Sequence, residues 1–168
     1  MPIVVFDLEG VLIDNRKRLK YALAIFNAKS IEDIKYPQRS RFWKVFLNPE
    51  LAEKMDNVNI LGLKILADRS KNCDIVIISG TRKEIALIHV QKLNNVAKNM
   101  GLSIKIDRLF YRRSSREKAP EFKERILRLL MLEDEIIEFH DDNEDVLKRV
   151  KKYGIKCYIW RDLRPERY

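Results

Sequence analysis

Cysteine and histidine are scarce in this chain, with two residues of each among 168. Two cysteines are too few for the disulfide framework of a small secreted protein. Cys73 and Cys157 lie in or beside apolar runs, so we expect reduced thiols with a structural role. Glycine and proline are also few, at five each, and no low-complexity tract, internal repeat or domain linker interrupts the sequence.

Long hydrophobic runs are missing as well. No apolar stretch reaches the ~20 residues that a helix needs to cross a bilayer. The first residues, Met1 to Asp7, lack the basic segment that begins a signal peptide. We therefore expect a cytoplasmic protein with no membrane partner.

The length and the composition indicate a single folded domain, residues 1–168. Domains commonly span roughly 100 to 200 residues. The chain is 46% hydrophobic and 35% charged, which allows a core and excludes a disordered protein. Its 34 Lys and Arg residues exceed its 25 Asp and Glu residues, for a net charge of +9. This balance favours polyanionic partners such as nucleic acid, but it indicates neither a fold nor a reaction.

The charge is unevenly distributed along the chain. Residues 133–145 form an acidic island that contains no Lys or Arg. Basic clusters occur at residues 16–20, 112–118 and 148–152. Each cluster has two interpretations, because a run of charge is often only the solvated face of a helix.

Five runs rich in β-branched and aromatic residues predict strands, at residues 3–6, 74–78, 104–111, 136–140 and 155–160. Residues 3–6 and 75–78 are continuously apolar, as in central strands that are covered on both faces. The spacing of apolar residues predicts helices over residues 82–100, 120–132 and 143–153. Strands that alternate with helices imply right-handed crossovers, a parallel sheet and an α/β fold.

One stretch, residues 13–73, is longer than a single crossover helix needs. It holds helical patterns at residues 16–28 and 58–67, with an aromatic and basic piece, residues 36–43, between them. We interpret residues 14–57 as a small helical insert over the edge of the sheet, and not as a separate domain.

Reactive residues follow two of the central strands, and ligands of open parallel sheets bind beyond the carboxyl ends of strands. Asp7 and Glu9 leave the first strand, with Gly10 to let the backbone turn. Two acids at this spacing can supply a nucleophile and an acid/base partner. Residues 79–82, Ser-Gly-Thr-Arg, follow the second strand, where a hydroxyl and free backbone N–H groups can hold an oxyanion. An ordinary helix N-cap is the alternative interpretation.

Acids also crowd the end of the fourth predicted strand, where residues 140–145 read His-Asp-Asp-Asn-Glu-Asp. Carboxylates at this density repel one another unless a hard cation lies among them, and such oxygen ligands select Mg²⁺. For Glu144 and Asp145, compensation of a helix dipole is the alternative. We expect His140 to have a structural role.

Taken in order, these pieces resemble the motifs of the haloacid dehalogenase superfamily of phosphatases and phosphotransferases. Asp7 and Glu9 match the first motif, Asp-x-Asp after a hydrophobic strand, and Ser79 matches the second, a strand that ends in Ser or Thr. Glu9 departs from the usual Asp and Val11 from the usual Thr. Glu carries the same carboxylate on a longer arm, so acid/base chemistry is retained.

The last two motifs leave alternatives open. Lys123 best fits the third motif, a Lys upstream of the final acidic pair, and Lys118 is the alternative. Asp141 and Asp145 match the fourth motif, Asp-x-x-x-Asp, and Asp142 between them is a further candidate.

The resemblance implies a three-layer α/β sandwich around a five-stranded parallel sheet of order 5-4-1-2-3, with the insert after the first strand. It also implies phosphomonoester hydrolysis with Mg²⁺ through an aspartyl-phosphate. Asp7 would be the nucleophile and Glu9 the acid and base, while Ser79 and Lys123 would hold the phosphate. The implied metal ligands are Asp7, the Glu9 carbonyl, Asp141 and Asp145.

Within the superfamily, the chain looks most like the phosphatase domain of polynucleotide kinase/phosphatase enzymes. The shared pieces are Arg18-Leu19, Trp43 with Phe46, the Ser-Gly second motif and residues 109–112, Leu-Phe-Tyr-Arg. The phosphate loop of a kinase half is absent. Arginine and aromatic residues near the mouth of the site suit a nucleic acid end, with guanidinium groups on phosphates and Trp43 or Tyr36 stacked on a base. The substrate-binding candidates are Gly80, Thr81, Arg82, Arg18, Arg112, Arg113 and Trp43.

Three functions follow from these observations. The leading prediction is a phosphatase that acts on 3′-phosphate ends of nucleic acid or on nucleotides. The alternative is a small-metabolite phosphatase whose site a partner subunit closes. A non-catalytic nucleic-acid-binding protein is disfavoured, because a capable residue occupies every expected catalytic position. A monomer and a homodimer both stay open, as do DNA and RNA.

Overall fold

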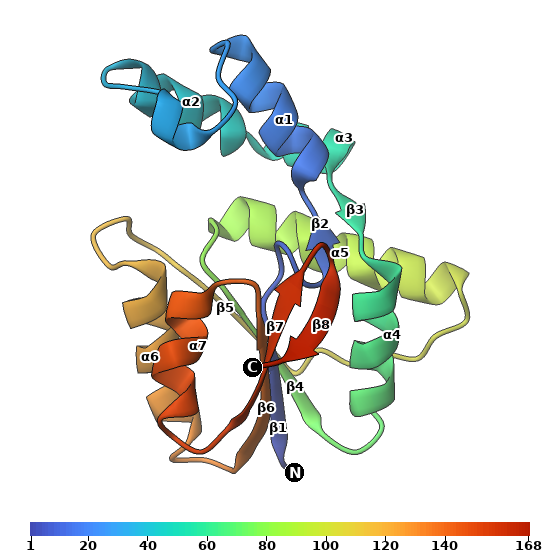
Figure 1. Cartoon of the computed structure of the whole chain (residues 1–168). Helices are drawn as coiled ribbons and strands as arrows, with labels where there is room; N and C mark the ends of the chain where they lie inside the picture. The colour runs from blue at the N-terminus through green and yellow to red at the C-terminus, as the bar shows by residue number, and fades with distance from the viewer.

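A central sheet with helices on both faces forms three layers in the computed structural model, which describes all residues, Met1–Tyr168 (Figure 1). The sheet has six strands in the order β5-β4-β1-β6-β7-β8. Their bounds are β1 Ile3–Phe6, β4 Asp74–Ser79, β5 Arg108–Tyr111, β6 Ile136–Asp141, β7 Lys156–Arg161 and β8 Arg164–Arg167. The first five strands of this order, β5, β4, β1, β6 and β7, are parallel, and their order in the sheet is the predicted one.

The strand β8 is missing from the sequence prediction. It pairs antiparallel with β7 across a turn in which Asp162 and Leu163 both have positive φ, as the favoured two-residue hairpin turns require. Its polar sequence, with Pro165 inside it, does not predict a strand. An edge strand tolerates proline because one side of it needs no ladder hydrogen bond.

The strand β5 is shorter than the predicted run 104–111, since it begins at Arg108. The Asp107 carboxylate accepts a hydrogen bond from the backbone N–H of Ile75 at 2.7 Å. That donor is therefore occupied by a side chain, and regular pairing of β4 with β5 starts only beyond it, at Val76 and Arg108.

The helices of the outer layers bury the two faces of the sheet. The helices α4 (Ile60–Arg69) and α5 (Lys83–Asn99) cover one face, and α6 (Ala119–Leu130) and α7 (Glu144–Lys151) cover the other (Figure 1). All four residues of β1 are buried, as their continuous apolar run predicts. Because β1 lies between β4 and β6, its carboxyl end is the centre of the site described below.

The helical insert (residues 14–57) stands above the carboxyl ends of the parallel strands, where Figure 1 shows α1, α2 and α3, and not at a lateral edge of the sheet. It leaves and rejoins the core through two short antiparallel strands, β2 (Ile13–Asp14) and β3 (Asn57–Val58). Between them lie α1 (Arg16–Ile25), the 3₁₀ helix η1 (Ile31–Asp33), α2 (Gln38–Phe46) and α3 (Pro49–Met55).

The aromatic and basic piece of the insert is a helix, α2, which the sequence did not predict. Phe42 and Phe46, four residues apart, stack at 5.7 Å between ring centroids. They join Ala22, Leu23 and Ile34 in a small core of the insert. The insert therefore has its own apolar centre, separate from the two larger clusters on the sheet.

The two cysteines lie inside the protein and form no disulfide. Cys73 and Cys157 are both buried and unpaired, and burial raises the pKa of the Cys157 thiol to about 11. None of the helices combines the length and the apolar character that crossing a membrane requires.

Candidate active site

A cavity of about 950 Å³ opens where the carboxyl ends of β1, β4 and β6 face the helical insert. Most of the predicted site residues line it. Those from the sheet side are Asp7, Glu9, Ser79, Gly80, Thr81, Arg82, Arg112, Arg113, Lys123 and Asp141, and Trp43 lines it from the insert. Two predicted residues, Arg18 and Asp145, do not line it.

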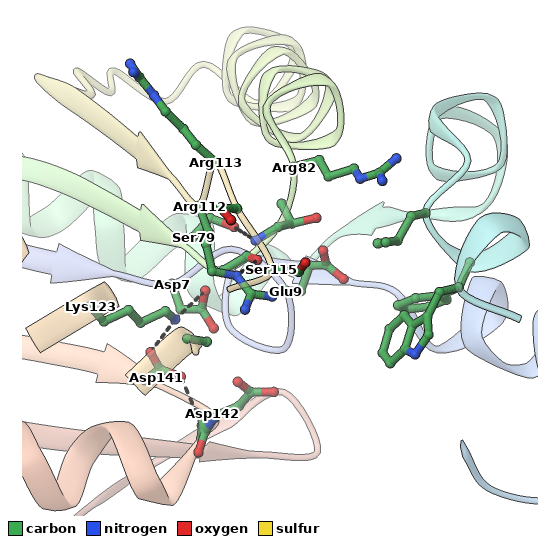
Figure 2. Close-up of a pocket in the computed structure, with 18 of the residues that line it drawn as sticks. Asp7, Glu9, Ser79, Arg82, Arg112, Arg113, Ser115, Lys123, Asp141 and Asp142 are labelled. Carbon is green, nitrogen blue, oxygen red and sulfur yellow. Dashed lines mark hydrogen bonds and ion pairs between the residues drawn. The ribbon is translucent and has the colours of Figure 1, made fainter. Parts of the chain in front are cut away.

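Three carboxylates converge at the bottom of the cavity. Asp7 follows β1, and Asp141 and Asp142 stand at the end of β6, with one oxygen of each residue within 4.8 Å of the others. The Lys123 ammonium lies 2.6 Å from Asp141 Oδ2 and 3.0 Å from Asp7 Oδ1 (Figure 2). Asp7, Asp141 and Lys123 are all buried. The sequence brings these groups together because parallel strands end at one edge of the sheet.

The charges in this cluster perturb one another. Burial, together with the Asp141 carboxylate, raises the pKa of Asp7 well above its ordinary value, against the lowering effect of Lys123. Burial alone would lower the pKa of Lys123, but the Asp141 and Asp7 carboxylates outweigh it and raise that pKa. Desolvation and the Asp141 charge raise the pKa of Asp142 to about 6, although its outer side is open to water. The group thus has an excess of negative charge that one lysine does not neutralise.

Asp142 takes the position that the sequence motif assigned to Asp145. Asp145 is exposed in the first turn of α7, and its backbone N–H is capped by the Asn143 side chain at 2.9 Å. The chain turns directly after β6, so Asp142, the residue next to Asp141, faces the cavity. Gly10 contributes to this packing, since a Cβ there would lie 2.2 Å from Asp142 Oδ2.

Lys123, and not Lys118, lies in the cluster. Lys118 is the exposed residue at the start of α6. Lys123 lies on the buried face of that helix, which also carries Phe122 and Ile126. The apolar spacing of α6 thus directs one lysine into the sheet layer.

The loop after β4 presents hydroxyl and backbone groups to the cavity. Ser79 is buried at the end of the strand, and its Oγ accepts a hydrogen bond from the Thr81 N–H at 3.2 Å. It is not an N-cap, because α5 begins four residues later and Arg82 holds the cap position. The Thr81 hydroxyl is buried, lines the cavity and has no hydrogen-bond partner. Buried hydroxyls are normally satisfied, so this one indicates a missing acceptor or donor in the cavity.

Glu9 faces the cavity beside Asp7 (Figure 2), and Arg18 holds it from behind. Arg18 was predicted to bind substrate, and this prediction is wrong. The side chain is fully buried, and its donors go to Glu9, Asp56 and the Phe46 carbonyl. A guanidinium with three internal acceptors has no face left for a ligand in the cavity.

The other predicted arginines do reach the cavity. Arg112 lines it while donating to the carbonyls of Gly80 and Glu117, at 3.1 and 2.9 Å. Arg113 is exposed and projects away from the carboxylates, whereas Arg82 projects toward the insert (Figure 2). All three arginines also line a second cavity, of about 490 Å³.

The insert supplies the opposite wall of the cavity. Trp43 is 38% exposed there, next to Tyr36, Ser40 and Leu47. Ser114 and Ser115, in the loop after β5, were also not assigned to the site. Their only sequence signal is a position after a strand, which many loop serines share.

His140 is structural, as expected. Its ring stacks between Phe6 and Tyr158, at 4.5 and 4.8 Å. Its Nδ1 accepts from the Trp160 indole N–H, and its Nε2 pairs with Glu138. Burial lowers the pKa of His140, so the ring is neutral at neutral pH.

Several solved structures have a fold similar to that of this chain. A haloacid dehalogenase-like hydrolase from Streptococcus pneumoniae matches 94% of this chain and 83% of its own, with a TM-score of 0.62 at 15% identity. The chain has the haloacid dehalogenase-like fold. The same fold in an enzyme from Bacteroides thetaiotaomicron, solved with magnesium and inorganic phosphate, matches 95% of this chain and 93% of its own, with a TM-score of 0.51 at 16% identity.

A third similar structure is a chain of the Pnkp1/Rnl/Hen1 RNA repair complex. It matches 95% of this chain but only 42% of its own, with a TM-score of 0.62 at 18% identity. No protein-family model and no curated protein sequence matches the chain.

Proposed function

We propose that this protein is a Mg²⁺-dependent phosphomonoester hydrolase that works through an aspartyl-phosphate on Asp7. The observation that carries the proposal is the cluster of Asp7, Asp141 and Asp142 at the bottom of a cavity on the carboxyl edge of the sheet, with Lys123 in contact with Asp7 and Asp141. The enzyme from Bacteroides thetaiotaomicron, which has the same fold and holds magnesium and phosphate, supports it.

The donor chemistry of the cluster fits Mg²⁺. All three groups offer carboxylate oxygens, which are the ligands that hard divalent cations prefer. Asp7, Asp141 and Asp142 would hold the ion, together with the Glu9 backbone carbonyl. When bound, Mg²⁺ would neutralise the charge that accumulates when a phosphate joins these carboxylates.

The residues of the chain account for both chemical steps. The Asp7 carboxylate attacks phosphorus, the bond from phosphorus to the leaving oxygen breaks, and protonated Glu9 gives its proton to that oxygen. Water then attacks the aspartyl-phosphate while the Glu9 carboxylate takes a proton from it. Phosphate leaves, and the Asp7 carboxylate and protonated Glu9 are restored.

The remaining residues of the site would bind the phosphoryl group. Lys123 touches Asp7 and therefore lies beside any phosphoryl group transferred to it. The Ser79 and Thr81 hydroxyls and the N–H groups of their loop would hold the other phosphoryl oxygens. The Thr81 hydroxyl would then gain the partner that it lacks.

For the substrate, we propose a 3′-phosphate at a nucleic acid end or on a nucleotide. Arg82, Arg112 and Arg113 are cations for flanking phosphates. Trp43 and the exposed Tyr36 offer rings on which a base can stack. The related fold in an RNA repair complex supports this choice.

A small phosphorylated metabolite is the second candidate. It is favoured by the position of the helical insert, which stands over the carboxyl edge and forms one wall of the cavity. For such a substrate the sequence predicted closure of the site by a partner subunit; here the insert of the same chain supplies one wall of the cavity.

Replacing the nucleophile tests the reaction. Asp7→Asn keeps the shape of the side chain but removes the attacking carboxylate, so Mg²⁺-dependent phosphate release should fall to background. The surface variant Asp68→Asn, in α4 and away from the cavity, should match the wild type. Phosphate release is measured with each variant in Mg²⁺ and in a chelator. Full activity of Asp7→Asn would exclude the proposed reaction.

A substrate panel in the same assay separates the two candidate substrates. It compares 3′-phosphorylated oligonucleotides, 3′-mononucleotides and sugar phosphates at equal concentration. We expect the highest kcat/KM on the oligonucleotides. Preference for sugar phosphates would replace the nucleic acid proposal with the metabolite one.

A further inference from the structure

A buried chain of polar side chains connects the helical insert and α5 to Glu9. Arg18 Nη2 donates to Glu9 Oε2 at 2.8 Å, and Arg18 Nε donates to Asp56 Oδ1 at 3.0 Å. Asp56 Oδ2 contacts His89 Nε2 of α5 at 2.7 Å. Arg18, Asp56 and His89 are each no more than 2% exposed. Such groups are rarely buried without a specific arrangement of partners.

The geometry at Glu9 separates its two oxygens. Oε2 accepts from both the Arg18 guanidinium and the Asn15 amide, whereas Oε1 has no hydrogen bond within the protein. The Glu9 side chain is 20% exposed, toward the cavity that it shares with Asp7. One oxygen is therefore anchored, and the other is free to exchange a proton.

The two hydrogen bonds to Oε2 restrict the rotation of the Glu9 side chain, which is longer than that of Asp. Glu has one more rotatable bond than the Asp that such a position commonly carries, and so a freely rotating Glu9 would spend less time in the reactive geometry. Two donors on Oε2 remove that freedom.

Arg18 is itself fixed by the insert. Its Nη1 donates to the Phe46 carbonyl at 2.7 Å, and the guanidinium lies 4.4 Å from the centre of the Phe46 ring. The Lys92 ammonium donates to three carbonyls at the end of α3, including that of Asp56 at 2.6 Å. Docking of the insert on α5 thus sets the position of Asp56, and Asp56 sets that of Arg18.

We propose that Arg18 is a positioning residue for Glu9, and that Asp56 orients Arg18 for this role. The inference rests on the proposed function, because it assigns Arg18 to the acid/base step. A purely structural Arg18 would hold the insert in place and would affect both chemical steps alike. Arg18 as a positioning residue affects the steps in proportion to their need for Glu9.

An aryl phosphate such as p-nitrophenyl phosphate distinguishes the two roles. Its leaving group departs readily without a proton, so formation of the aspartyl-phosphate needs Glu9 little, whereas hydrolysis of that intermediate needs Glu9 as a base. In Arg18→Lys we therefore expect kcat to fall and aspartyl-phosphate to accumulate. The phosphorylated fraction is measured by mass spectrometry of acid-quenched enzyme. The exposed Arg16→Lys, in the same helix, is the matched control and should behave as the wild type.

A double-mutant comparison tests whether Arg18 acts through Glu9. Glu9→Gln should lose about 100- to 10,000-fold in kcat, the usual contribution of acid/base catalysis. Arg18→Lys should lose part of this factor, and the double variant should lose no more than Glu9→Gln alone. Independent losses that multiply in the double variant would overturn the proposal, as would wild-type kcat in Arg18→Lys.

Thermal unfolding of each variant shows whether it folds. If Arg18→Lys does not fold, the same measurements on the isosteric Asp56→Asn decide, and they should show a smaller accumulation of aspartyl-phosphate. No accumulation in that folded variant overturns the inference. If the wild type releases no phosphate, or if Asp7→Asn is fully active, the proposed function itself fails. If both behave as expected and Arg18→Lys matches the wild type, only the role of Arg18 fails.

Discussion

Lys123 is the residue on which the electrostatic balance of the site depends. Its ammonium is buried, 2.6 Å from Asp141 and 3.0 Å from Asp7. Separation from water costs each of these ions several kcal/mol, and their mutual attraction offsets that cost. Removing this one cation leaves two buried carboxylates without a partner. The cost in stability is far larger than that of losing an exposed ion pair.

Replacing Lys123 with Met should therefore lower the free energy of unfolding by about 3 to 5 kcal/mol in the absence of Mg²⁺. Addition of Mg²⁺ should stabilise Lys123→Met more than the wild type, since a bound cation would supply the missing positive charge. Thermal unfolding with Mg²⁺ and with a chelator measures both effects. Exposed Lys118→Met is the control. Equal stabilisation of variant and wild type by Mg²⁺ would argue against a cation among the carboxylates.

At the scale of elements, a buried carboxylate on β6 joins this strand to α4. Glu138, on β6, contacts Arg69 at the end of α4 at 2.9 Å and His140 at 3.0 Å. Burial opposes ionisation of Glu138, but the hydrogen bonds from His140 and Arg69 lower its pKa to about 2. The same strand ends in Asp141, so the network holds the strand that carries the acidic pair.

The lowered pKa of Glu138 predicts a pH dependence of stability. The folded-state pKa of about 2 lies below the ordinary value of 4.5, so the stabilisation is complete above that value and is lost as the pH falls from 4.5 toward 2. Glu138→Gln should be less stable than the wild type at pH 7, and the difference should shrink by pH 3. Chemical unfolding at both pH values measures it. A difference that stays constant would contradict the assignment.

At the scale of the molecule, the net charge of +9 hides a local separation of charge. The bottom of the cavity holds three carboxylates, while its rim carries Arg82, Arg112 and Arg113. A phosphorylated ligand can thus place its reacting group at the acidic centre and further phosphates on the basic rim. Such an arrangement attracts a polyanion from a distance but holds the phosphoryl group only where a cation is available.

Binding of single-stranded 3′-phosphorylated oligonucleotide to Asp7→Asn should weaken as salt rises. Contacts from the three rim arginines correspond to a slope of about −2 in a plot of log affinity against log salt. Arg82→Gln should make this slope shallower by about 0.7, the value for one phosphate on a single strand. Lys98→Gln, at the opposite end of α5, is the control and should not change it. Fluorescence anisotropy measures the affinities, and insensitivity to salt would favour the metabolite.

Much of the frame of this protein is determined by the sequence alone. The continuous apolar runs identify β1 and β4 as central strands, because only strands covered on both faces have no polar alternation. Parallel strands end at one edge, so the motifs after them place Asp7, Ser79 and Asp141 together before any coordinates are known. These inferences succeed because they depend on local periodicity and on chain direction.

Only the tertiary structure decided which of several similar side chains enter the site. Asp142 rather than Asp145 faces the cavity, because the turn after β6 sets the direction of each side chain. Arg18 is buried, while Arg112 and Arg113 line the cavity. Asp56, the partner of Arg18, lies 38 residues further along the sequence, so no local sequence pattern predicts this ion pair. The position of the insert above the strand ends likewise follows from packing between segments far apart in sequence, which local periodicity does not encode.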